Sequence, residues 1–181
     1  MVWIIVVILV LLILYVISTY NTLVGLKNKV KDGWSQIEVV LKRRADLIPN
    51  LVETVRGYAK HEEGTLTAVV EARNKAIKAA TPEEAMKADG EVTQALSRLF
   101  ALTESYPELK ANQNFLDLQK SLEETENKIT YSRQFYNDNV LNYNNKTEMF
   151  PSNIVASIFR FEKFKFFEAS EKDRETPKVQ F

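Results

Sequence analysis

The sequence predicts an all-α protein: an antiparallel four-helix bundle with long first and last helices, preceded by one N-terminal transmembrane helix. Every charged side chain follows Leu26, and beyond that residue apolar positions recur in alternating steps of four and three, which is typical of bundle seams. Five Gly and five Pro among 181 residues are too few for a loop-rich β fold.

The composition excludes several kinds of function. The 24 Lys and Arg balance 24 Asp and Glu, so no basic surface for nucleic acid is expected. The absence of cysteine excludes disulfides, thiolate metal sites and a cysteine nucleophile. With one histidine as well, we predict no catalytic residue, no cofactor and no metal site.

Residues 1–20 are predicted to form a membrane anchor that contacts the lipid bilayer through residues 2–20. Val2 to Ile17 is an unbroken apolar run and the next three residues are uncharged, close to the about 17–25 residues that span a bilayer. The run lacks the basic flank and small-residue cleavage site of a signal peptide, so an anchor is favoured over a cleaved leader. Lys and Arg follow the run and none precedes it. The positive-inside rule therefore places the N-terminus outside a bacterial inner membrane and the bundle in the cytoplasm.

The bundle is predicted over residues 21–150. Its first helix, about 21–59, has a seam from Val30 to Tyr58 that is apolar except at Arg44. The seam continues past Pro49, so that proline predicts a kink and not an end.

The second helix, about 62–80, is expected to bury a seam of Leu66, Val70, Arg73, Ile77 and Ala80. Thr81-Pro82-Glu83-Glu84 then resembles an N-cap with a capping-box glutamate and opens the third helix, about 82–106. Pro107 ends that helix, and one face carries Ala85, Asp89, Val92, Leu96, Leu99, Thr103 and Tyr106.

The fourth helix, about 109–148, has an aromatic or aliphatic residue every seven positions, at Phe115, Leu122, Ile129, Tyr136 and Tyr143. Residues 151–181 follow as a short aromatic segment and a charged C-terminal tail. The last residues, Val179 to Phe181, would suit capture by a PDZ-type module or would simply fray.

Four charged residues are predicted to form a structural polar layer across the bundle: Arg44, Arg73, Asp89 and Glu126. In an antiparallel hairpin, a turn near residue 81 places Arg73 opposite Asp89. The same reasoning for the first and last helices places Arg44 opposite Glu126. Such a network fixes helix register, and losing one partner of a buried pair is costly. The alternative is a ligand or anion pocket.

His61-Glu62-Glu63 is the other cluster that could carry chemistry. A zinc protease site would need a second histidine, and a di-iron bundle would need Glu-x-x-His pairs, whereas Tyr58 stands three residues before His61. We expect these residues to form the acidic first turn of the second helix instead.

The segment after the fourth helix contains five phenylalanines interleaved with charges. Because that helix returns towards the anchor, the segment is a candidate for membrane or partner contact. It could enter the headgroup layer or pack on the first helix, and the sequence leaves both open. The residues are Phe159, Phe161, Phe164, Phe166 and Phe167.

Several stretches resemble the LemA family. They include the run from Lys42 to Val55, the segment from Tyr106 to Asn112, Tyr136-Asn137, Tyr143-Asn144 and Phe167-Glu168. The resemblance implies a bacterial single-pass membrane protein with a helical-bundle domain and no defined activity. Because members are often encoded near membrane proteases and envelope-stress genes, it also implies a protein partner of that kind.

Together these observations predict a non-enzymatic, membrane-anchored scaffold or adaptor that recruits protein partners, without nucleic acid. A seam that runs past the end of the bundle would also allow self-association. The alternative is a small-ligand receptor or enzyme built around the polar layer. An accessible pocket lined by the four charged residues would favour this alternative, whereas closure and mutual bonding of the four would favour the scaffold.

Overall fold

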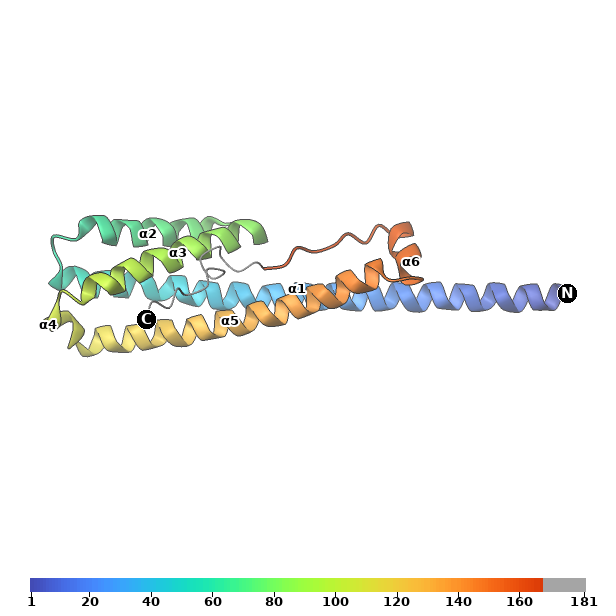
Figure 1. Cartoon of the computed structure of the whole chain (residues 1–181), viewed down its shortest axis with the longest axis horizontal. Helices are drawn as coiled ribbons and strands as arrows, with labels where there is room; N and C mark the ends of the chain where they lie inside the picture. Colours follow the sequence, from blue (N-terminus) through green and yellow to red (C-terminus); the bar gives the residue numbers. More distant parts are fainter. Residues whose placement is uncertain (168–181) are drawn as a thin grey trace, which may run out of the picture. The chain divides into compact units, whose positions relative to one another are not determined.

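A computed structural model describes residues 1–167, which are all-helical without a strand, so the predicted all-α class is confirmed (Figure 1). The expected charged tail and Val179–Phe181 lie outside the described residues. The described chain forms two compact units, residues 1–36 with 132–167 and residues 37–131. Its helices are α1 (Val2–Tyr58), α2 (Glu63–Lys78), α3 (Pro82–Thr103), α4 (Pro107–Lys110), α5 (Gln113–Glu148) and α6 (Ser152–Ile158).

Helix α1 is continuous from the apolar run into the charged part of the chain, and it continues through Pro49. Residues 1–20 continue without a break into the rest of α1, and the Thr22 hydroxyl donates to the Ser18 carbonyl at 2.9 Å within the helix. By length and composition, the N-terminal part of α1 could cross a membrane.

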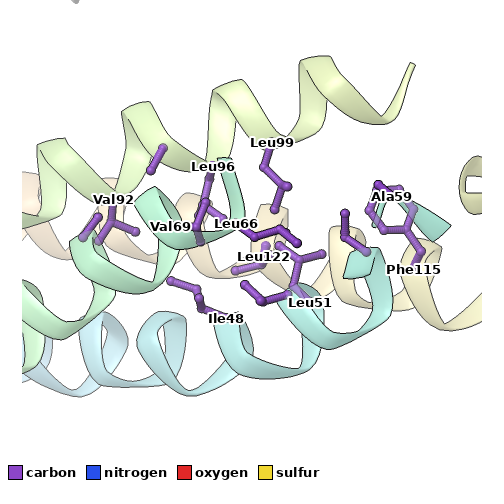
Figure 2. Close-up of a cluster of buried hydrophobic side chains, with 14 of the residues drawn as sticks. Ile48, Leu51, Ala59, Leu66, Val69, Val92, Leu96, Leu99, Phe115 and Leu122 are labelled. Carbon is purple, nitrogen blue, oxygen red and sulfur yellow. The ribbon is translucent and has the colours of Figure 1, made fainter. Parts of the chain in front are cut away.

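In the unit of residues 37–131, one hydrophobic core collects side chains from α1 to α5 (Figure 2). The seam positions predicted for α1, α3 and α5 supply most of it. Its fully buried members include Ile48, Leu51, Val55, Leu66, Leu99, Leu109 and Phe115.

The predicted seam of α2 is confirmed only in part: Leu66 is buried and Val70 packs half-buried against the core, but the prediction is wrong at Ile77. The buried positions are Leu66, Val69 and Ala72, whereas Ile77 is 52% exposed. Val70 and Ala76 are half-buried against the same core, so the face that α2 buries is centred on Leu66, Val69 and Ala72. Its alanines give little hydropathy contrast between faces, which explains why periodicity alone misplaced this one.

Local hydrogen bonds cap the starts of α3 and α5. Thr81 caps α3 by accepting from the Glu84 amide at 3.2 Å, and the Glu84 carboxylate accepts from the Ala80 amide at 2.8 Å. Residues 107–110 form the separate α4. Helix α5 then begins at Gln113 and not near 109, because Asn112 Oδ1 accepts from the Phe115 amide at 3.0 Å as an N-cap.

In the unit of residues 1–36 and 132–167, α1 and α5 run antiparallel with a close backbone approach. A Cβ added to Gly33 would lie 3.2 Å from the Tyr136 Cα. Helix α6 packs against α1 through a small core of Leu23, Val155 and Ala156.

Candidate functional site

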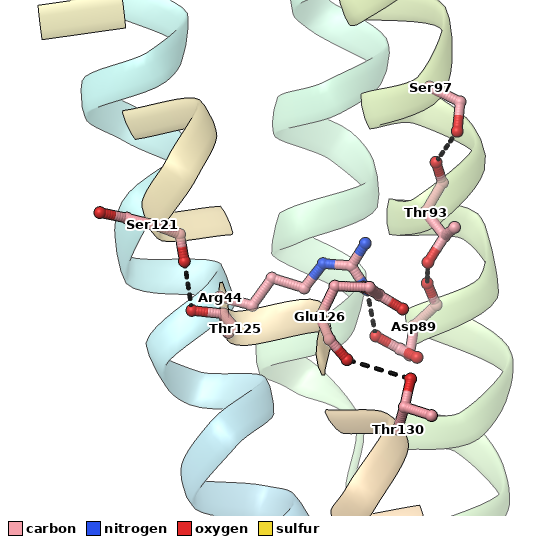
Figure 3. A network of polar contacts seen from close by, with 8 residues as sticks. All are labelled: Arg44, Asp89, Thr93, Ser97, Ser121, Thr125, Glu126 and Thr130. Atoms are coloured by element: carbon pink, nitrogen blue, oxygen red, sulfur yellow. Dashed lines mark hydrogen bonds and ion pairs between the residues drawn. The ribbon is translucent and has the colours of Figure 1, made fainter. Parts of the chain in front are cut away.

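The polar layer brings three helices of the second unit together. Arg44 of α1 contacts a carboxylate of α3 and one of α5: its Nη1 lies 2.8 Å from Asp89 Oδ1 and 3.0 Å from Glu126 Oε2 (Figure 3). The Arg44 side chain is 6% exposed and that of Asp89 is 3% exposed, whereas that of Glu126 is 38% exposed. The guanidinium therefore donates a hydrogen bond to the deeply buried Asp89 carboxylate and forms an ion pair with Glu126, whose Oε2 is itself buried and accepts no hydrogen bond from the described residues.

The hydroxyl side chains around this layer bond within their own helices. Thr93 donates to the Asp89 carbonyl at 3.1 Å and Thr130 donates to the Glu126 carbonyl at 3.1 Å (Figure 3). Thr125 does the same to the Ser121 carbonyl at 2.7 Å. These hydroxyls therefore bond to the carbonyl four residues earlier in their own helix. The contacts between helices in this layer are made by the charged side chains of Arg44, Asp89 and Glu126.

Arg73, the fourth predicted member, bonds elsewhere. Its Nε donates to the backbone carbonyl of Ala45 at 3.2 Å, and its Nη1 donates to Asn74 Oδ1 at 3.2 Å. In a regular helix the amide of residue 49 would donate to the Ala45 carbonyl, but residue 49 is proline and has no N–H. Arg73 thus supplies the donor that Pro49 lacks and ties α2 to α1.

A cavity of about 320 Å³ lies beside the polar layer, between α1, the end of α2 and the start of α3. Arg44 and Asp89 form part of its wall, with Lys42 and Asp46, which pair with each other at 2.9 Å. The rest of the lining is mostly small and apolar, including Leu41, Ala45, Ala76, Ile77, Ala79, Ala85 and Val92. Such a cavity could hold a small amphipathic molecule.

The His61-Glu62-Glu63 cluster lies at the start of α2. His61 is exposed, Glu63 lies in the first turn, and Glu62 Oε1 accepts from the Tyr106 hydroxyl at 3.0 Å. That hydrogen bond raises the pKa of Tyr106. Among residues 1–167, no group of three or more His, Cys, Asp and Glu is arranged to hold a metal ion.

The five phenylalanines of the aromatic segment, in the unit of residues 1–36 and 132–167, differ in how far they are buried. Phe167 is buried and Phe161 and Phe164 are half-buried, whereas Phe159 and Phe166 are largely exposed. The inward positions are therefore three residues apart. The Phe161 ring centroid lies 5.6 Å from that of Tyr20, and the Phe164 ring centroid lies 5.1 Å from that of Tyr143. The Arg133 guanidinium lies 4.6 Å from the centroid of the Phe167 ring.

Two Tyr-Asn pairs on α5 hold the backbone of this segment, and we call them the Tyr–Asn ladder (Tyr136, Asn137, Tyr143, Asn144). Asn144 donates to the Phe164 carbonyl at 2.9 Å and accepts from its amide at 3.1 Å. Asn137 does the same for Phe167, at 2.9 Å and 2.7 Å.

The two tyrosines add one backbone bond each. The Tyr143 hydroxyl donates to the Glu162 carbonyl at 2.9 Å, and the Tyr136 hydroxyl donates to the Lys165 carbonyl at 3.0 Å. Burial, and then the nearby Glu162 charge, raises the pKa of Tyr143. Each Tyr-Asn pair therefore recognises main-chain groups, and the aromatic contacts recognise the side chains.

Sequence reasoning did not identify this ladder or α6. The available signal for the ladder was the repetition of Tyr-Asn after seven residues, which places both pairs on one helix face. For the Arg73–Ala45 bond, the signal was Pro49 itself, because a proline within a helix frees the carbonyl four residues earlier.

Comparisons with known proteins show sequence similarity to several bacterial proteins. The chain is 27% identical over 175 residues to magnetosome protein MamQ 2 of Paramagnetospirillum magneticum, a match that covers 82% of this chain and 64% of that relative. It is 25% identical over 174 residues to magnetosome protein MamQ of Magnetospirillum gryphiswaldense, with the same 82% and 64% coverage. The chain thus spans less than two thirds of the length of these magnetosome relatives.

A third relative has a more similar length. Protein LemA of Metamycoplasma hominis is 27% identical over 158 residues, covering 85% of this chain and 71% of that protein. Residues 33–181 match the LemA family, and the residues of the polar layer and of the Tyr–Asn ladder fall within this range. The chain therefore belongs to the LemA family.

Proposed function

We propose that this protein is a non-enzymatic, membrane-anchored helical scaffold or adaptor that recruits protein partners at the inner face of a bacterial inner membrane. Its helices would act as an antiparallel four-helix bundle. The main support is the Arg44–Asp89 pair: these buried charged groups bond to each other at 2.8 Å and join α1 to α3. A pair satisfied in this way stabilises one register and needs no ligand.

The proposed topology is a single pass with the N-terminus outside. It is supported by the exposed apolar run of α1 and by the lysines that follow it, at 27, 29 and 31. The natural chain has no cysteine, so Gly64→Cys gives a single label site, and no atom lies within 4 Å of a Cβ added there. In intact cells this cysteine should resist a membrane-impermeant maleimide until the cells are opened. Labelling before opening would overturn the proposed orientation.

The adaptor role can be tested by photocrosslinking in cells. A photoreactive amino acid is placed along one exposed stripe of α2 and one of α5, and a partner docked on a stripe should give a product of one mass at all its positions. A product of twice the chain mass would identify self-association as the contact. Absence of products from every position would overturn the adaptor role. The positions are Thr67, Glu71 and Asn74 on α2, and Lys120, Glu124 and Asn127 on α5.

The second candidate is a small-ligand receptor or enzyme, favoured by the cavity of about 320 Å³ beside Arg44 and Asp89. Ala85→Leu places a larger apolar side chain at the cavity wall without removing a charge. An adaptor should keep its crosslinking pattern in this variant. A receptor whose docking depends on an occupied cavity should lose the pattern while its thermal unfolding stays cooperative.

A further inference from the structure

Helix α6 lies at the level where the apolar run of α1 ends. Leu23 of α1 is buried against Val155 and Ala156 of α6, and the Tyr20 ring lies 4.8 Å from that of Phe159. The close approach of Gly33 to Tyr136 gives the same level, because counting outwards along the two antiparallel helices places residue 150 opposite about residue 19.

The length of the apolar run places this level at one edge of a bilayer. As an α-helix, residues 2–20 extend about 28 Å, against a hydrocarbon core of about 30 Å. Side chains of α1 are exposed on all sides up to Tyr15, and the first covered position is Val16. The α5–α6 turn therefore covers the last turns of a stretch that has bilayer length.

The outward side of the turn is apolar. Four large side chains, which we call the α5–α6 turn surface, are Met149, Phe150, Ile154 and Ile158, with exposures of 62%, 79%, 52% and 66%. They surround a helix of only seven residues whose buried side already packs on α1. Four large exposed apolar side chains within ten residues are a candidate interaction site.

Basic groups lie near this surface, and Glu148, the carboxylate directly before Met149, is neutralised by an ion pair with Lys163. Lys27 lies over the Phe161 ring, 5.9 Å from its centroid, and Arg160 is exposed directly after α6. Apolar and aromatic side chains beside Lys and Arg suit the boundary between acyl chains and phosphate headgroups.

We propose that the α5–α6 turn surface inserts into the interfacial layer of the leaflet where the N-terminal anchor ends. This proposal rests on the proposed membrane anchoring of α1. A lipid surface fits better than a protein partner because the patch lies level with the end of the apolar run and has a basic border. The chain would thus hold the membrane at two places far apart in sequence, residues 2–20 and residues 149–158.

The experiment uses the full chain, reconstituted in vesicles of phosphatidylethanolamine and phosphatidylglycerol. A nitroxide is attached to a single cysteine introduced by Phe150→Cys, and its collisions with oxygen and with a water-soluble nickel chelate are measured. Leu141→Cys is the matched control, because Leu141 is also an exposed apolar residue of α5 but lies about 14 Å further along the helix. Leu9→Cys, in the middle of the apolar run, reports separately on the anchor.

The proposal predicts that the label at residue 150 collides less with the nickel chelate and more with oxygen than the label at residue 141. The membrane depth calculated from these collision rates should lie between the depths of the labels at residues 9 and 141. An aqueous signal at 150 with a lipid signal at 9 would overturn the inference and leave the anchor intact. Aqueous signals at both would overturn the inference together with the anchor. Protection of residue 150 from both collision partners would indicate protein contact, such as a second copy, and would also overturn it.

Discussion

The bond between Arg73 and the carbonyl freed by Pro49 leads to a quantitative prediction. Arg73→Met removes the donor that lies 3.2 Å from the Ala45 oxygen and leaves a carbonyl on a residue that is 6% exposed. Hydrogen bonds from charged donors contribute about 1.5–3 kcal/mol, and an orphaned buried group costs about 1–3 kcal/mol. Because the Arg73 side chain is only half-buried, we expect a loss near the lower end, about 1–2 kcal/mol.

The cause is isolated by a double-mutant cycle with Pro49→Ala. Alanine restores the amide at residue 49, which can then donate to Ala45 as in a regular helix, so Arg73→Met should cost less than about 0.5 kcal/mol in that background. Unfolding of the full chain in detergent micelles by urea, followed by circular dichroism, gives each free energy. Arg98→Met, at an exposed site on α3, controls for loss of a positive charge and should be nearly neutral. Equal costs of Arg73→Met in the natural chain and in the Pro49→Ala variant would refute this account.

Three further predictions concern other close contacts. Gly90→Ala should stabilise the chain by about 1 kcal/mol, because alanine has the higher helix propensity and no described atom lies near the added Cβ. Gly33→Ala should give no such stabilisation, because its Cβ would lie 3.2 Å from the Tyr136 Cα; thermal unfolding of the two variants tests this difference. Asn144→Ala should weaken docking of the aromatic segment by about 1–3 kcal/mol, seen as faster amide exchange at its backbone partner, while exposed Asn142→Ala should leave exchange unchanged. The pKa of Tyr143 is raised above 10.0, so the stability that its neutral hydroxyl provides is complete below pH 10 and is lost as pH rises through the folded-state pKa. In a pH titration followed by tyrosinate absorbance, Tyr143 should ionise after the exposed tyrosines, and this late absorbance step should be missing in Tyr143→Phe.

The parts of this structure that repeat along a helix could be predicted from the sequence. Regular spacing in α1, α3 and α5 identifies their buried positions, and a constant rise per residue is enough to place Arg44 opposite Glu126. The face of α2 could not be identified in this way, because small residues such as Ala72 pack closely without a strong hydropathy signal.

For contacts between side chains and distant backbone, the sequence marks one partner but does not identify the other. The ladder joins Asn137 to a residue 30 positions away, in a segment with no regular secondary structure of its own. No periodicity marks such a segment, and its path depends on where α6 directs the chain.

The Tyr–Asn ladder has a consequence for which sequence changes the segment can tolerate. Seven residues of α-helix rise about 10.5 Å, and three residues of extended chain cover about 10 Å, so successive pairs on α5 meet positions three apart in the segment. The hydrogen bonds of the two pairs go only to main-chain groups, and Lys163 and Phe166 make none of the ring contacts with α5, so these two positions should accept most substitutions. Inserting or deleting one residue between Phe164 and Phe167 would instead move one of these residues away from its asparagine while the other stays paired. Related chains should therefore vary freely in residue type at these positions while keeping the length of the segment fixed.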